Sequence, residues 1–181
     1  MKTVLGLFVG FSLFIAGALE AQEMPFHIPD VVTHQIKSTN VDQTFAIHVW
    51  QPMTKKDGSE KFPVLYITDA NGGVSQGDLI HYLHLGGDAQ RFIIVGIGYP
   101  VDHALGGSNL RRRDLTPTPS AQFEAEFGLP VDGVPSITSG KKSGGAKEFL
   151  SFIRDELVPF VDKNYNTIEG DRGFFGDSLG G

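Results

Sequence analysis

The sequence predicts an α/β fold, with one domain built on a mostly parallel sheet flanked by helices. Two continuous apolar runs, Pro63–Thr68 and Phe92–Gly98, are typical of strands buried on both faces of such a sheet. The segment Lys147–Tyr165 carries apolar side chains at helical spacing, and a third candidate buried strand, Arg172–Gly176, follows it. This alternation of strands and helices indicates βαβ crossovers.

The remaining elements fit the same architecture. Val31–Gln51 predicts two β segments, the second with alternating apolar residues. Asp69–Gly73 is a strong turn signal, and Gln76–Leu85 predicts a short helix. Tyr99–Gly145 is rich in proline and glycine and lacks a clear period, so we expect a functional loop there, or an insertion with short helices such as Ala121–Phe127.

The amino terminus has the build of a secretory signal peptide. Lys2 precedes the apolar run Val4–Ala16, and small residues follow that permit cleavage after Ala18 or Ala21. We therefore expect residues 1–21 to be removed and residues 22–181 to form the mature domain, exported to the periplasm or secreted. An uncleaved anchor and a buried helix are the alternatives. No later segment has the length and apolar character of a membrane span.

Composition excludes several classes of function. The chain has no cysteine, which excludes disulfides, thiolate metal sites and a cysteine nucleophile. A net charge of −6 argues against a nucleic-acid partner. His81 and His84 have helical spacing but no acidic partner at ligand distance, so we expect no metal site. The basic run Arg111–Arg113 is interpreted either as a solvated turn or as a site for an anion or carboxylate.

Ser178 is the candidate nucleophile. It is the serine of a G-x-S-x-G pattern, Gly176–Gly180, which follows the short apolar pair Phe174–Phe175. In a nucleophile elbow, a sharp turn between a strand and a helix exposes the serine hydroxyl, and the next backbone N–H faces the same space. That N–H belongs to Leu179. The alternative is a glycine-rich turn whose serine only caps a helix.

An oxyanion hole needs a second N–H donor, from a loop after an earlier strand. Asp69–Gly73 follows the first buried strand and is suited to a tight turn with free amides. An ordinary turn closed by an Asp or Asn side chain is the alternative, and both can hold together.

Five blocks resemble one family. They are Leu65–Asn71, Val95–Tyr99, Arg111–Pro117, Phe149–Tyr165 and Gly176–Gly181. They are similar to the esterase family of α/β hydrolases that includes esterase D, the mycolyltransferases and the enterochelin esterase-like hydrolases.

The resemblance implies a serine hydrolase that cleaves small-molecule carboxylic esters through an acyl-enzyme and needs no cofactor. It matches Ser178 with the nucleophile, and the backbone N–H groups of Leu179 and Asn71 with the oxyanion donors. Asp69, Arg113 and Asp114 match the surroundings of the substrate pocket. Arg113 and Asp114 are equally interpreted as a structural ion pair.

The sequence departs from the family pattern after the serine. The order of the catalytic groups in this fold is serine, acid, histidine, and no histidine follows Ser178. We therefore expect an amino-terminal fragment of the fold, truncated just after the elbow and inactive alone, because a serine needs a base. An acyltransferase of the same fold and an exported non-catalytic binding protein are the alternative functions.

Overall fold

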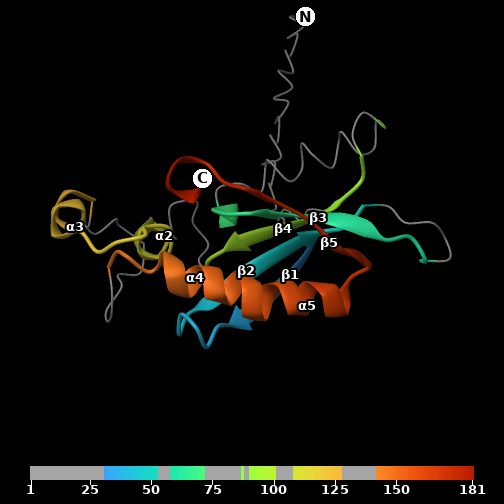
Figure 1. The fold of residues 1–181 in the computed structure, drawn as a ribbon, viewed down its shortest axis with the longest axis horizontal. Coiled ribbons are helices and arrows are strands. Elements are labelled where there is room, and N and C mark those ends of the chain that lie inside the picture. Colours follow the sequence, from blue (N-terminus) through green and yellow to red (C-terminus); the bar gives the residue numbers. More distant parts are fainter. Residues whose placement is uncertain (1–30, 53–57, 72–86, 88–89, 101–107, 128–141) are drawn as a thin grey trace, which may run out of the picture.

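Five strands form one mixed sheet in the order β1-β2-β4-β3-β5 (Figure 1). The computed structural model describes residues 31–52, 58–71, 87, 90–100, 108–127 and 142–181. The strands are β1 Val31–Lys37, β2 Thr44–Trp50, β3 Phe62–Ile67, β4 Ile93–Gly98 and β5 Thr167–Phe175. The helices are α2 Ser108–Asp114, α3 Ala121–Phe127, α4 Ala146–Phe152, the π-helix η1 Ile153–Leu157, α5 Val158–Asn164 and the 3₁₀ turn η2 Ser178–Gly180.

The sheet is parallel in the half that carries the candidate site. β3 pairs in parallel with both β4 and β5, whereas β1, β2 and β4 pair antiparallel. The predicted α/β class is confirmed, with two of the four pairings parallel. Because β4, β3 and β5 point the same way, their carboxyl ends meet at one edge, where ligands bind in open α/β sheets.

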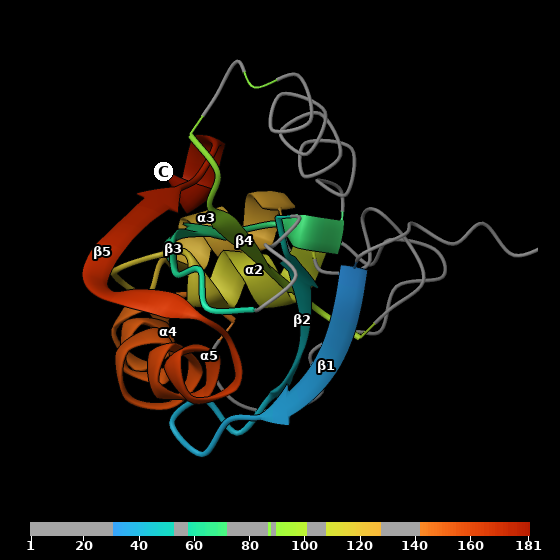
Figure 2. The same cartoon turned by 90° about the vertical axis from the view of Figure 1, so that its right-hand side faces the viewer.

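The main core lies between the sheet and the helix that runs from α4 through α5. Figure 2 shows this helix along one face, with β1 and β5 at opposite edges of the sheet. Phe45 stacks on Phe152 with ring centroids 4.3 Å apart, and Leu157 and Val161 are fully buried. Burial of each such side chain contributes about 1.5–3 kcal/mol. The predicted helical periodicity therefore reflects contact with the sheet.

The predicted helix is not uniform, because a π turn interrupts it. Ile153–Leu157 is π-helical and α5 begins directly after it, with Pro159 in its first turn. Proline lacks an N–H and its ring clashes with the carbonyl four residues earlier, here that of Asp155. A wider turn before Pro159 relieves that clash. Pro159 thus coincides with a π turn on its amino-terminal side.

Glu156, in the π turn, ties this helix to the loop between β1 and β2. Its Oε1 accepts hydrogen bonds from Thr39 N at 3.0 Å, Thr39 Oγ1 at 2.5 Å and Asn40 N at 3.3 Å. Burial alone would raise the pKa of Glu156, but these hydrogen bonds outweigh burial and hold the pKa below its ordinary value of 4.5. The fold therefore favours the ionised carboxylate.

Glu156→Ala should lower the free energy of unfolding of the full-length protein by about 1.5–3 kcal/mol near neutral pH. A group whose pKa is lowered on folding stabilises above its unfolded pKa, and this contribution is lost as the pH falls through the folded pKa. The difference from wild type should therefore shrink below pH 4.5. Urea unfolding at a series of pH values measures it, with the exposed Arg154→Ala as control. A difference that does not vary with pH would contradict the assignment.

β5 is less buried than its sequence predicts. Phe174 and Phe175 are 51% and 47% exposed, so the interpretation of Arg172–Gly176 as a buried strand is wrong in that respect. The strand is longer, beginning at Thr167, and it is the edge strand of the described sheet. Apolar residues on an edge strand look the same in sequence as those on a central one.

Two helices occupy the stretch expected to be an irregular loop. α3 coincides with the predicted short helix, whereas α2 was not predicted. The segment 76–85, expected to be helical, and the expected signal peptide lie outside the described residues. Within the described part of the chain, no helix is both long enough and apolar enough to cross a membrane.

Candidate active site

The site is built on the carboxyl ends of β3 and β5. Ile67 pairs with Phe175 in the last rung of the two strands, and Thr68 N donates to Phe175 O at 3.2 Å just beyond it. The chain turns sharply after each of the two strands. The chain after β3 continues through Asp69, and the chain after β5 continues to Ser178.

The turn after β5 holds Ser178 in the left-handed region, with φ of 57°. Asp177 before it is extended, and η2 begins at Ser178 itself. A Cβ at Gly176 would lie only 1.7 Å from Gly180 O, so the turn requires glycine at that position. A non-glycine residue at positive φ is uncommon and is characteristic of functional sites. The strand, turn and helical turn match the predicted order of elements.

The turn Gly176–Gly180, called the elbow below, packs against the turn after β3. Gly180 is buried, and a Cβ there would lie 2.3 Å from Thr68 Oγ1 and 3.1 Å from Asp69 Oδ2. Thr68 Oγ1 donates to Gly180 O at 3.5 Å. The structure therefore brings the Ser178–Leu179 turn beside the segment that sequence analysis selected for the second oxyanion donor.

β4 holds that segment in place. Gly96 leaves room for Ala70, because a Cβ at Gly96 would lie 2.8 Å from Ala70 Cβ. The Asn71 side chain is used structurally: its Nδ2 donates to Tyr99 O and its Oδ1 accepts from Tyr99 N, both at 2.6 Å. Since the side chain bonds to the end of β4, Asn71 would take part in chemistry through its backbone.

Arg111 is a functional candidate that sequence analysis named only as part of the basic run Arg111–Arg113. From α2, its Nε and Nη2 donate to Asp69 Oδ1 and Oδ2 at 2.6 and 2.7 Å. The hydrogen bond that Arg111 donates to Asp69 is the main reason that the pKa of Arg111 is raised, and the charge of Asp177 adds to it. The interpretation of the arginine run as a solvated turn is wrong, because the run lies on a helix. For Arg111 the carboxylate interpretation fits, and the carboxylate is the protein's own.

Arg113 and Asp114 form a buried ion pair. Arg113 Nε lies 2.6 Å from Asp114 Oδ1, and Tyr99 Oη donates to Asp114 Oδ2 at 3.0 Å. The Asp114 side chain has no exposed surface. Burial raises the pKa of Asp114, against the lowering effect of Arg113, and burial also raises the pKa of Tyr99. With its oxygens engaged by Arg113 and Tyr99, Asp114 fits the structural ion pair better than a role in the substrate pocket.

Asp114→Ala should destabilise the full-length protein by about 3–5 kcal/mol, because Arg113 would be left buried without its partner. Asp155→Ala is the matched control, since Asp155 accepts from Arg154 in the same side-on geometry but at an exposed position. It should change the free energy of unfolding by less than about 1 kcal/mol. Urea unfolding measures both. Equal effects would argue against an energetic role of burial at Asp114.

The two described histidines lie far from the elbow in the sheet. His34 on β1 bonds through Nε2 to Tyr165 Oη at 2.5 Å, and His48 on β2 bonds through Nδ1 to Thr33 Oγ1 at 2.9 Å. β4 and β3 separate both strands from β5. Neither histidine is therefore a base for Ser178. The other four lie outside the described residues.

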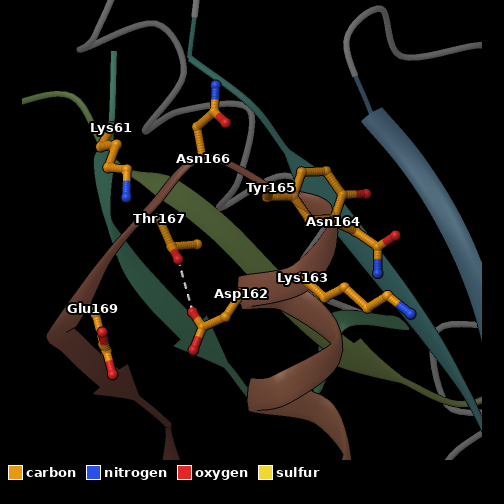
Figure 3. Close-up of a pocket in the computed structure, with 8 residues that line it drawn as sticks. All are labelled: Lys61, Asp162, Lys163, Asn164, Tyr165, Asn166, Thr167 and Glu169. Carbon is orange, nitrogen blue, oxygen red and sulfur yellow. Dashed lines mark hydrogen bonds between the residues drawn. The ribbon is translucent and has the colours of Figure 1, made fainter. Parts of the chain in front are cut away.

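A hollow of about 420 Å³ lies among the described residues at the opposite end of β5 (Figure 3). Its lining is polar and of mixed charge, comprising Lys61, Asp162, Lys163, Asn164, Tyr165, Asn166, Thr167 and Glu169. Asp162 already accepts from Thr167 Oγ1 at 2.8 Å and from Arg172. No group of three or more potential metal ligands occurs among the residues that the structure describes. The elbow edge remains the candidate active site.

Comparison with known proteins agrees with this geometry. Residues 122–181 match the family model described as "Putative esterase". Over 162 residues the chain is 30% identical to the ferri-bacillibactin esterase BesA of Bacillus subtilis, covering 86% of this chain and 52% of that protein. The chain is therefore similar to esterases of this family, and its fold is of the α/β-hydrolase type.

Two further comparisons match different shares of the chain. A siderophore enterobactin esterase of Emericella nidulans is 33% identical over 91 residues, which is 49% of this chain and 28% of that protein. The crystal structure of the BES protein from Bacillus cereus superposes with a TM-score of 0.70 at 25% identity, covering 89% of this chain and 56% of that one. The chain thus spans about half the length of BesA and of the BES protein.

Proposed function

We propose that the complete protein is a carboxylic ester hydrolase with Ser178 as its nucleophile. The observation that carries this proposal is the left-handed conformation of Ser178 at the turn between β5 and η2, packed against Thr68 and Asp69. A strained turn of this kind at the carboxyl end of a parallel strand presents a hydroxyl to a substrate. The similarity to proteins named as esterases supports the same chemistry.

In the proposed reaction, Ser178 Oγ attacks the ester carbonyl while a histidine later in the complete protein takes its proton. The backbone N–H groups of Leu179 and Asn71 stabilise the oxyanion, and each such donor contributes about 10²–10³ in rate. The alcohol leaves, and water releases the acyl group from Ser178. No cofactor takes part.

We propose a siderophore ester as the substrate class. Two relatives are named as esterases of ferri-bacillibactin and of enterobactin, and both names describe small-molecule esters. An exported protein would meet such compounds outside the cytoplasm. Residues 1–21 are accordingly proposed to direct export to the periplasm or the medium, leaving residues 22–181 as part of one hydrolase domain.

A fluorophosphonate probe tests the nucleophile. The full-length protein should take up one equivalent, and peptide mass spectrometry should locate the adduct on Ser178. A polypeptide ending at Gly181 should take up none, because no histidine follows the serine in it and an unassisted serine is a poor nucleophile. Absence of labelling in the full-length protein, or labelling elsewhere, would refute the proposal.

A further inference from the structure

We infer that Arg111 is a positioning residue for the elbow: by holding the Asp69 carboxylate, it fixes the two turns that carry the oxyanion donors. This inference rests on the proposed function. Sequence analysis placed Asp69 among the substrate-pocket candidates, but the structure shows both of its carboxylate oxygens bound by Arg111.

The pair has the geometry of a strong contact. The guanidinium uses two donors on two oxygens, at 2.6 and 2.7 Å, and such forked charge-assisted pairs are both stronger and more directional than single bonds. The Arg111 and Asp69 side chains are only 26% and 30% exposed, so water screens them less than a surface pair. Arg111 therefore restricts where the Asp69 carboxylate can lie.

Asp69 transmits that restriction to the elbow. The Oδ2 atom that Arg111 Nη2 binds is also the atom that a Cβ at Gly180 would approach to 3.1 Å. The carboxylate thus lies between the guanidinium and the chain that follows Ser178. If the carboxylate rotated or moved away, Gly180, the last residue of η2, would lose this packing contact.

The backbone of Asp69 needs this support. Its φ of 60° lies in the left-handed region, which costs about 1–3 kcal/mol and persists only when the surroundings enforce it. The contacts of Ala70 and Asn71 with β4 hold the carboxyl-terminal side of this residue. The pair with Arg111 holds its side chain. Arg111 also attracts Asp177, the residue directly before Ser178, so one cation acts on both turns.

The test uses the full-length protein with four variants: Arg111→Gln, Arg111→Lys, Asp69→Asn and the double variant Arg111→Gln/Asp69→Asn. For a p-nitrophenyl ester, kcat of Arg111→Gln should fall about 10²-fold, the loss expected when reacting groups shift by about 1 Å, while KM stays within about twofold. Lysine keeps the charge but not the fork, so it should recover only part of kcat. The double variant should lose no more than Arg111→Gln alone, because both changes break one contact.

Arg154→Gln is the matched control, because Arg154 makes a forked pair with Asp155 at an exposed position. It should leave kcat unchanged.

An unchanged kcat in Arg111→Gln, a defect confined to KM, or additive losses in the double variant would overturn the inference. Asp69→Asn keeps the shape of the side chain and decides the matter if Arg111→Gln does not fold. Failure of both to fold would show a purely structural pair and would also overturn it. Absence of phosphonate labelling in the wild type would instead refute the proposed function.

Discussion

Ser178→Ala in the full-length protein should abolish ester hydrolysis. Removal of the serine from a comparable triad lowers kcat by about 10⁶, because the remaining oxyanion hole and binding contacts give only residual catalysis. The substitution removes one oxygen from a side chain classed as exposed, so the fold should be unaffected. Turnover of a p-nitrophenyl ester measures the loss, and a urea unfolding curve equal to that of wild type establishes that the variant is folded.

Ser151→Ala is the control for this experiment, since Ser151 lies on α4 and not on the turns that follow β3 and β5. It should retain full activity. Turnover retained by Ser178→Ala would mean that another group is the nucleophile, and would remove the main support for the proposed reaction.

Gly176→Ala should reduce kcat by at least about 10²-fold. The added Cβ would lie 1.7 Å from Gly180 O and 2.2 Å from its carbonyl carbon, so the turn would have to open by more than an ångström. A displacement of about 1 Å at reacting groups costs about 10²-fold in rate. Because the clash is with backbone, no side-chain rotation can relieve it. The turnover number and the rate of phosphonate labelling should fall together.

Gly173→Ala provides the comparison within the same strand. A Cβ there would meet only the terminal methyl carbon of Leu65, at 3.1 Å, and that side chain can rotate away. Its kcat should stay within about threefold of wild type, since a flexible contact yields at little cost. If Gly176→Ala were equally mild, the elbow would not depend on the tight turn, and the geometric argument for Ser178 would fail.

The parallel half of the fold could be predicted from sequence because its signal is local. β3 and β4 are continuous apolar runs, and the helix over Ala146–Asn164 presents Phe149, Phe152, Leu157 and Val161 to the sheet. The strand and turn before Ser178 are likewise predicted by residues that are adjacent in the sequence. Each of these patterns follows from the geometry of a single element.

The features that sequence analysis missed depend on distant partners. α2, with the sequence SNLRRRD, has no apolar periodicity, and Arg111 gains its stabilising partner only when Asp69 is in place. The exposure of Phe174 and Phe175 depends on which neighbours β5 has, which their own sequence does not specify. The role of Asp69 was unclear for the same reason, since Arg111 lies 42 residues away along the chain.

The contact between Thr68 and Gly180 joins residues 112 positions apart. β4 and the long helix lie between them along the chain, so the pairing of β5 with β3 closes a long loop. Contacts of such long sequence separation form slowly, because the chain loses loop entropy before they compensate for it. The elbow would then be among the last parts to acquire its geometry during folding. Mutations far from Ser178 that loosen the pairing of β5 should therefore reduce activity at temperatures where most of the molecule is still folded.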